Sequence, residues 1–261
     1  MGILNVTPDS FSDGGRYIDS KNALNHALKM IDMGADIIDI GGESTRPGSN
    51  PVSELDECNR VIPVIESIKK INSKILISVD TYKSYVAKRA IEAGADIVND
   101  ISGLTFDSKM IPLLSEKDIP VIIMHINGRP KTMQNNPLYN DLIKEIKYFL
   151  IKQCELAEEN GIKKSNIILD PGIGFGKSFE HNFTLIRRLK EISDLGYPLM
   201  IGPSRKAFIG DALNLPPDER LEGTLATVIA GILNGANIIR VHDIKEVNRA
   251  VLITEKIMRS A

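Results

Sequence analysis

One short phrase occurs three times in the chain, and it constrains the fold more than any other feature. It is Gly-Ala-Asp or Gly-Ala-Asn followed by an apolar, mostly β-branched run, at residues 34–39, 94–99 and 235–240. Each copy follows a helical pattern, so its glycine suits the position where a left-handed residue ends a helix. The short apolar run is typical of a strand that is buried on both faces. The phrase therefore predicts a helix–turn–strand unit that is used several times.

The rest of the chain extends this alternation. Five further segments have the pattern of buried strands, at residues 2–6, 75–80, 120–125, 166–170 and 198–202. Helical spacing of apolar residues fills the intervals, at residues 24–31, 53–71, 83–93, 108–116, 138–160, 178–192, 221–232 and 245–258. We expect Ser20 to cap the first helix and Pro63 to kink or split the second.

Eight alternating units in 261 residues are typical of one architecture. A (β/α)8 barrel, or TIM barrel, has about 250 residues and forms a single domain. The sequence therefore predicts an α/β fold with one barrel domain over residues 1–261. An open, doubly wound sheet is the alternative, because alternation alone does not prove that the sheet closes.

Charge and cysteine content restrict the class of protein. Lys and Arg number 32 and Asp and Glu number 34, and this net charge of −2 argues against general binding of nucleic acid or anionic membranes. No apolar run approaches the ~18 residues of a transmembrane helix, and residues 1–10 lack the features of a signal peptide. Cys58 and Cys154 form neither a metal spacing nor a redox motif. We therefore expect a cytoplasmic protein with no nucleic-acid or membrane partner.

Polar residues stand at the carboxyl end of nearly every expected strand. In a barrel these ends meet on the face that carries the active site. Any one of them could be a helix cap or a loop residue, but the whole set predicts a site. Its members are Asn5, Asp39, Asp80, Asn99, His125, Asp170, Gly202, and Arg240 with His242.

Two long loops follow the first two strands, at residues 7–19 and 42–53. Both are rich in Gly, Pro, Ser and Asp, and loops of this length in a compact domain are often lids. A solvated surface loop is the alternative for each.

The segment after Asp170 resembles a phosphate-binding loop but does not meet its pattern, because Pro171 stands where the Walker motif requires glycine. Asp170 itself can accept two parallel N–H bonds from a planar, amidine-like edge. The following glycines then allow a close backbone approach and direct Phe175. The alternative is a plain turn with an exposed aspartate.

Several basic residues are candidates for binding an anion. Arg240 and His242 are two apart in a strand and so point to the same side, where Arg46 could join them on a phosphate or pyrophosphate. A structural ion pair is the alternative for Arg240. Lys206 could donate to a ring nitrogen or carbonyl, form a Schiff base, or be a surface residue. The other histidines are interpreted as helical, strand-end and surface residues: His26, His125 and His181.

A series of motifs resembles the dihydropteroate synthases of the pterin-binding enzyme family, in order over residues 1–243. They are MGILNVTPDSFSDGG (1–15), DIGGESTRPG (39–48), ISVDT (77–81), NDIS (99–102), MH (124–125), PKTMQ (130–134), DPGIGFG (170–176), SRK (204–206) and IRVHD (239–243). The resemblance implies a (β/α)8 barrel. It also implies the condensation of 6-hydroxymethyl-7,8-dihydropterin pyrophosphate with p-aminobenzoate, which gives dihydropteroate and pyrophosphate.

The resemblance further implies roles for individual residues. Asp80, Asn99 and Asp170 would read the pterin ring, Lys206 would donate to it, and its walls would be Ile101, Met124, Phe175 and Gly202. The pyrophosphate would be held by Arg46, Arg240 and His242, and by Mg²⁺ bound partly through Asn5. The first loop would supply Asp13, which stabilises the cationic methylene, and Phe11, which closes the site. The arylamine pocket would be shaped by Thr45, Arg46 and Pro47. A homodimer is also implied.

Two departures bear on the arylamine. Ala207 stands where the family often has serine, and Pro203 is not its commonest residue. Two other functions stay as alternatives: a pterin-dependent methyltransferase of the same barrel family, and a non-catalytic pterin-binding barrel. The methyltransferase would not need the STRP loop, the SRK segment and the RVH segment together, and Asp13, Arg46, Lys206 and His242 argue against a non-catalytic role.

Overall fold

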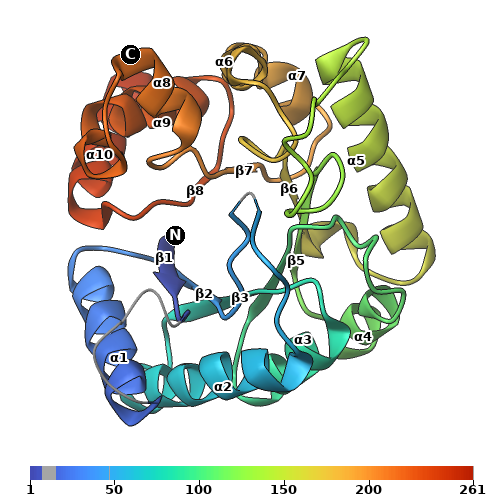
Figure 1. Cartoon of the computed structure of the whole chain (residues 1–261), viewed down its shortest axis with the longest axis vertical. Helices are drawn as coiled ribbons and strands as arrows, with labels where there is room; N and C mark the ends of the chain where they lie inside the picture. The colour runs from blue at the N-terminus through green and yellow to red at the C-terminus, as the bar shows by residue number, and fades with distance from the viewer. Residues whose placement is uncertain (8–15, 47, 261) are drawn as a thin grey trace.

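The structure is a computed structural model that describes residues 1–7, 16–46 and 48–260. In this part of the chain, eight strands alternate with helices around a ring (Figure 1). They are β1 (Gly2–Asn5), β2 (Ile37–Gly41), β3 (Leu76–Asp80), β4 (Ile97–Asp100), β5 (Val121–Met124), β6 (Ile167–Asp170), β7 (Met200–Ile201) and β8 (Ile238–Ile239). All eight predicted strands are confirmed, including the three that belong to the repeated phrase.

The sheet closes on itself. β1 to β6 form a parallel sheet in sequence order, and β7 pairs with β8 in a second parallel sheet. Parallel bridges from Leu169 to Leu199 and from Gly2 to Val241 connect the two sheets. The backbone amide of Ile3 donates to the carbonyl of Val241 at 3.0 Å, so β1 lies beside the end of β8. The predicted barrel is confirmed, and the open-sheet alternative is wrong.

The helices cover the outside of this ring (Figure 1). They are α1 (Arg16–Asp32), α2 (Glu54–Ile71), α3 (Ser84–Glu92), α4 (Met110–Lys117), α5 (Leu142–Glu159), α6 (Phe179–Arg187), α7 (Lys190–Ser193), α8 (Ala207–Leu213), α9 (Leu221–Leu233) and α10 (Ile244–Arg259). The repeated glycines follow α1, α3 and α9 with φ values of 95°, 109° and 100°, as the left-handed end of a helix requires.

Three helix predictions need correction, and one helix was not predicted. Ser20 lies inside α1 and does not cap it, because the helix begins one turn earlier, at Arg16. The residues between Gly15 and Ser20 include none that breaks a helix. Pro63 does not split α2. Proline has no N–H, so the backbone carbonyl of Asn59, four residues earlier, loses its helical hydrogen bond. Asn59 is exposed, so water can take the place of that donor. The helix expected over 178–192 is two helices, α6 and α7, and α8 was not predicted.

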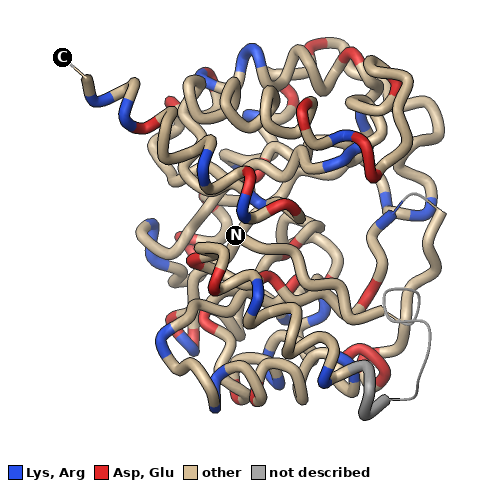
Figure 2. The backbone as a smooth tube through the Cα atoms, turned by 90° about the vertical axis from the view of Figure 1, so that its left-hand side faces the viewer, with Lys and Arg blue, Asp and Glu red and all other residues tan. Residues whose placement is uncertain are grey.

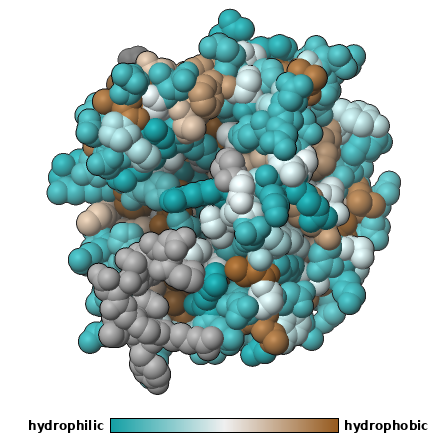
Figure 3. All heavy atoms as spheres, viewed as in Figure 1, coloured by the Kyte–Doolittle hydropathy of each residue, from teal (hydrophilic) through white to brown (hydrophobic). Residues whose placement is uncertain are grey.

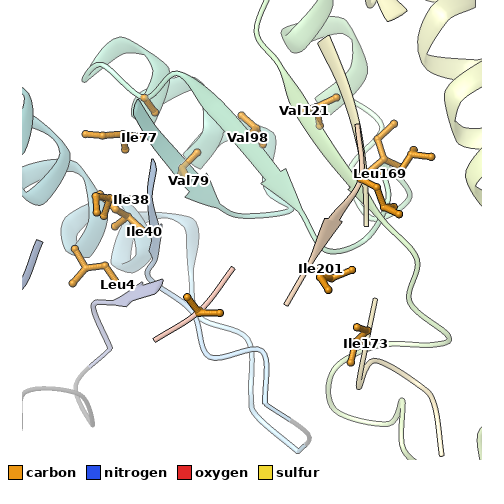
Figure 4. Packing of buried hydrophobic residues seen from close by; sticks show 14 of the residues in the cluster. Leu4, Ile38, Ile40, Ile77, Val79, Val98, Val121, Leu169, Ile173 and Ile201 are labelled. Atoms are coloured by element: carbon orange, nitrogen blue, oxygen red, sulfur yellow. The ribbon is translucent and has the colours of Figure 1, made fainter. Parts of the chain in front are cut away.

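Alternation along the strands divides the core into two sides. One set of side chains, labelled in Figure 4, belongs to the main apolar core of strands and helices and includes Ile38, Ile40, Ile77, Val79 and Val98. The residues between them form the interior of the barrel, where Ile37, Ile97, Ile122 and Met200 make a separate apolar cluster. Two residues further along β2 and β4, the interior positions are the polar Asp39 and Asn99. The fold thus places an apolar floor beneath a ring of polar groups.

The surface has mixed charge. Figure 2 shows Lys and Arg interspersed with Asp and Glu on the side that it presents. Among the described residues, none of the helices is both long and apolar enough to span a bilayer. Cys58 and Cys154 are free, buried thiols.

Candidate active site

The polar ring is organised by one guanidinium group. Arg240 follows β8, and its Nε donates to Asp39 Oδ2 at 2.6 Å while NH2 donates to Asp80 Oδ2 at 2.8 Å. Asn99 donates from Nδ2 to the same Asp39 oxygen at 3.2 Å. The predicted ring readers Asp80 and Asn99 therefore lie together with Arg240 at the carboxyl ends of the strands. The structural ion pair considered for Arg240 is also present.

Three acceptor oxygens of this ring lack a partner. Asp39 Oδ1, Asp80 Oδ1 and Asn99 Oδ1 are buried and accept no hydrogen bond from the described residues. An unsatisfied buried acceptor costs about 1–3 kcal/mol, so such groups are rare without a purpose. Burial raises the pKa of Asp80 to about 7. The positive charge of Arg240 lowers this pKa, and the negative charge of Asp39 raises it. The ring is therefore prepared for a flat ligand that carries several N–H donors.

Asp170 lies at the end of β6 next to this ring. Its Oδ1 accepts from the backbone amide of Gly172 at 2.7 Å, and burial raises its pKa. Gly172 has φ +70°, and a Cβ there would lie 1.9 Å from the carbonyl oxygen of His125. The close backbone approach expected of this glycine is confirmed, and Asp170 is buried rather than exposed on a plain turn.

Lys206 reaches across to the loop that follows Asp170. Its Nζ donates to the carbonyl of Ile173 and lies 4.3 Å from the centre of the Phe175 ring. Gly174 has φ +81°, which favours glycine, and a Cβ there would lie 2.8 Å from Lys206 Cδ in its present position. Burial lowers the pKa of Lys206 to about 7, although the negative charge of Asp170 raises it. Lys206 is thus a site lysine and not a surface residue.

Apolar side chains form one wall of the site. Ile101 and Met124 are buried in a small cluster with Ile126 and Met133, and Phe175 packs against it. The structure therefore brings together the three apolar side chains predicted to enclose a ring.

A second group of basic residues lies next to Arg240. His242 Nδ1 is 3.0 Å from the hydroxyl of Ser204, and burial and Arg240 lower its pKa to about 4. Arg46 is exposed on the second loop, and its positive charge also lowers the pKa of His242. It therefore lies within electrostatic range of His242. His242 is therefore neutral near pH 7 in the free protein and not the cation expected of an anion-binding residue, because desolvation and the nearby guanidinium groups disfavour a further positive charge.

The remaining predicted residues are placed as follows. Asn5 ends β1 and pairs in register with Gly41 on β2. Gly202 lies against Arg240, because a Cβ there would be 3.7 Å from Arg240 Cβ. Thr45 is half-buried on the second loop. Three predicted residues lie outside the described part of the chain: Phe11, Asp13 and Pro47.

Two site residues were missed, and two histidines have contacts that the sequence did not indicate. Asp39 was noted only as a strand end. Lys177 is 1% exposed, lies 3.0 Å from His125 Nδ1 and donates to the carbonyl of Phe175 at 3.0 Å. His125 directly follows β5, as its interpretation as a strand-end residue predicts, and burial and Lys177 lower its pKa to about 2. His181 is a member of the capping box of α6 and not a plain surface histidine.

Comparisons with known proteins agree with this geometry. Residues 1–242 match the pterin binding enzyme family. The chain is 53% identical to the dihydropteroate synthase of Bacillus subtilis over 249 residues, 95% of this chain and 85% of that protein. It superposes on a Yersinia pestis dihydropteroate synthase with a sulfonamide complex at TM-score 0.94 and 44% identity, covering 100% of this chain and 94% of that one. A Xanthomonas albilineans dihydropteroate synthase with 4-aminobenzoic acid gives TM-score 0.94 and 38% identity, with coverage of 100% and 93%.

Proposed function

The chain belongs to the pterin-binding enzyme family, and from this premise we infer that it catalyses the dihydropteroate synthase reaction. It condenses 6-hydroxymethyl-7,8-dihydropterin pyrophosphate with p-aminobenzoate to give 7,8-dihydropteroate and pyrophosphate, a step of folate biosynthesis. The observation that carries this function is the set of buried, unpaired oxygens on Asp39, Asp80 and Asn99 beside Asp170. A reduced pterin supplies the ring and exocyclic N–H groups that such a set requires.

We propose that Asp170 accepts the 2-amino edge of the pterin. Its Oδ1 already takes one backbone N–H, so the carboxylate is fixed in orientation before the substrate arrives. Asp80 and Asn99 would take the remaining ring donors, and Lys206 would donate to a ring acceptor. Ile101, Met124 and Phe175 would cover the faces of the ring, and Gly202 would leave room for it next to Arg240.

Departure of pyrophosphate is proposed to depend on Arg240, His242 and Arg46. The C–O bond to pyrophosphate breaks with its electron pair going to the leaving oxygens, which leaves a cationic methylene. The arylamine nitrogen then bonds to this carbon and loses one proton to water or to the released pyrophosphate. Nε and NH2 of Arg240 are held by two carboxylates, while NH1 has no acceptor among the described residues. Ser204 orients the His242 ring, which can offer its other N–H to the anion. Fixed donors at the point where charge develops lower the barrier without reorganisation.

Mg²⁺ is proposed to accompany the pyrophosphate. The described residues contain no group of three or more His, Cys, Asp or Glu side chains suited to hold a metal alone. This fits Mg²⁺, which keeps several waters and binds through one or two protein oxygens and the substrate phosphates. A Cβ at Gly41 would lie 3.7 Å from both Asn5 Oδ1 and Asp80 Oδ2, so Asn5 offers an amide oxygen beside the polar ring. When bound, the ion would neutralise the charge of the leaving group.

The two rival functions differ from this one in their products. A pterin-dependent methyltransferase would pass a methyl group on without releasing pyrophosphate, and a pterin-binding barrel would release nothing. We expect the purified protein with Mg²⁺ to form a product whose mass equals dihydropteroate. A panel of substituted arylamines in the same reaction, read by mass spectrometry, identifies the amine that is used fastest. Product from no arylamine at all would contradict the proposed function.

The protein is proposed to form a homodimer through α9 and α10. The end of α10 projects beyond the rest of the molecule in Figure 2, and apolar side chains reach the surface over these helices in Figure 3. On α10, Ile253 is 60% exposed and Ile257 is 66% exposed. Exposed apolar side chains one turn apart on a helix favour self-association, usually with two-fold symmetry. Light scattering should give twice the chain mass of 28.8 kDa, and the Ile257→Glu variant should give the monomer mass. A monomeric wild type would contradict the proposal.

A further inference from the structure

A buried ion cluster closes the base of the second loop, and none of the roles assigned above uses it. Lys83 precedes α3, and its Nζ donates to Glu43 Oε2 at 2.6 Å, to Glu57 Oε2 at 2.5 Å and to the carbonyl of Val52 at 2.8 Å. An ammonium group has three N–H donors, so all of them are used. Side-chain exposure is 11% for Lys83, 7% for Glu43 and 1% for Glu57. The cluster is therefore both buried and saturated.

Glu43 joins the two ends of the loop. It is the second residue of the loop, and its Oε2 also accepts from the backbone amide of Val52, at 2.9 Å. Its other oxygen accepts from the hydroxyl of Tyr82 at 2.8 Å. Because Lys83 binds Glu43 and the Val52 carbonyl at once, one carboxylate and one ammonium hold the ends of the loop together. We call this pair, Glu43 and Lys83, the loop staple.

Contacts beyond the staple are sparser. Inside the loop, Ser49 Oγ donates to the carbonyl of Ser44 at 2.5 Å. Toward the loop after β5, Gly48 donates to the carbonyl of Pro130 at 3.3 Å, and the exposed Lys131 reaches Asn50 at 3.2 Å. The base of the loop is also held by Arg60, whose NH1 donates to the carbonyl of Gly42 at 2.7 Å. The staple is thus part of the anchor from which the loop runs toward the middle of the ring of helices in Figure 1.

We propose that Glu43 and Lys83 are positioning residues for the arylamine. The loop carries Thr45 and Arg46, the described residues that the family resemblance assigns to the arylamine pocket, and the inference rests on the proposed function. The groups assigned to the pterin ring stand on the strand ends, and no hydrogen bond among the described residues joins them to the staple. Loosening the staple would therefore weaken arylamine binding and leave pterin binding in place.

The chain offers a matched control at the opposite end of the barrel. Asp96, which precedes β4, accepts from Lys69 Nζ at 2.7 Å and from the backbone amide of Ile77 at 2.7 Å. Lys69 also donates to the carbonyl of Ile75 at 2.8 Å. A carboxylate, an ammonium, a backbone amide and a backbone carbonyl are thus combined as in the staple, but far from the site.

The test compares Glu43→Gln with Asp96→Asn. Glutamine keeps the shape of glutamate and one acceptor oxygen, but its NH2 group opposes a donor of Lys83, Val52 or Tyr82. With saturating pterin pyrophosphate, we expect Glu43→Gln to raise the KM for the arylamine about tenfold, because misplaced binding groups lose their effective concentration. The KM for the pterin substrate should change less than about twofold, and Asp96→Asn should leave both values unchanged.

Hydrogen exchange of the backbone amides in residues 44–52 adds a readout that does not depend on turnover. We expect faster exchange in this loop for Glu43→Gln but not for Asp96→Asn. Equal loop exchange in the two variants, or a rise confined to the pterin KM, would overturn the inference. If the wild type forms no product while loop exchange still rises only in Glu43→Gln, the staple stands and the proposed function fails.

Discussion

Replacing Arg240 with alanine is expected to lower kcat/KM for the pterin substrate by about 100-fold to 1,000-fold, the usual effect of losing one fixed donor to a developing anion. The structure adds a second consequence. Asp39 is 0% exposed and Asp80 is 9% exposed, and both lose their cation. Leaving buried charge unpaired costs about 3–5 kcal/mol, so the variant should also unfold at a lower denaturant concentration.

The pH dependence of this loss has a defined sign. The pKa of Asp80 is raised to about 7 already in the wild type, against an ordinary value of 3.8, and removal of Arg240 raises it further. A carboxyl with a raised folded pKa favours folding at low pH, and this contribution is lost as pH rises through the folded value. The destabilisation of Arg240→Ala should therefore be greater at pH 8 than at pH 6 in urea unfolding. A folded variant with wild-type turnover would show that Arg240 has no role with pyrophosphate.

Replacing Asp170 with asparagine should separate binding from stability. Asparagine can still accept from Gly172, but it carries no charge, and its NH2 would face the N–H groups of the pterin. We expect the KM for the pterin substrate to rise about 100-fold to 1,000-fold, or about 3–4 kcal/mol, as for the loss of charged hydrogen bonds. Burial raises the pKa of Asp170, so its charge opposes folding, and the free energy of unfolding at pH 8 should not fall.

Asp100 is the matched control for Asp170. It is also a buried carboxyl at a strand end, with its pKa raised to about 6 by burial, and it accepts from the amides of Ser102 and Leu104 at 2.7 and 3.2 Å. It follows the interior residue Asn99, so alternation points it away from the polar ring. Asp100→Asn should leave the pterin KM unchanged. Equal effects of the two substitutions would contradict the assignment of Asp170.

Local sequence patterns are sufficient to predict most of the barrel. A glycine that ends a helix and the short β-branched run after it are local signals that located three of the strands. The other five were located from their short apolar runs alone. Ser20 and Pro63 show the limit, because a helix can begin before a good capping residue and a proline on an exposed helix face need not break it. The helix α8 has only seven residues, too few to show a helical period.

The candidate site was predictable where a residue carries its own signal. Asp80, Asn99, Asp170, Lys206 and Arg240 stand at strand ends or in motifs, and the structure brings them together. Asp39 was not assigned because its partner Arg240 is 201 residues away, and only the register of the closed sheet joins them.

Other buried contacts had no signal in the spacing of residues. Lys177 and His125 meet across 52 residues, and Lys83 and Glu43 meet across 40. No period or motif connects such pairs, because their contact exists only after the strands and loops have packed.

The most direct measurement of the central claim is pyrophosphate release by the purified protein. The protein is incubated with Mg²⁺ and 6-hydroxymethyl-7,8-dihydropterin pyrophosphate, with and without p-aminobenzoate, and pyrophosphate is measured over time. We expect release that requires both substrates, that matches dihydropteroate formation one to one, and that falls when EDTA removes the metal. Absence of release with both substrates present, or release that does not depend on the arylamine, would contradict the account.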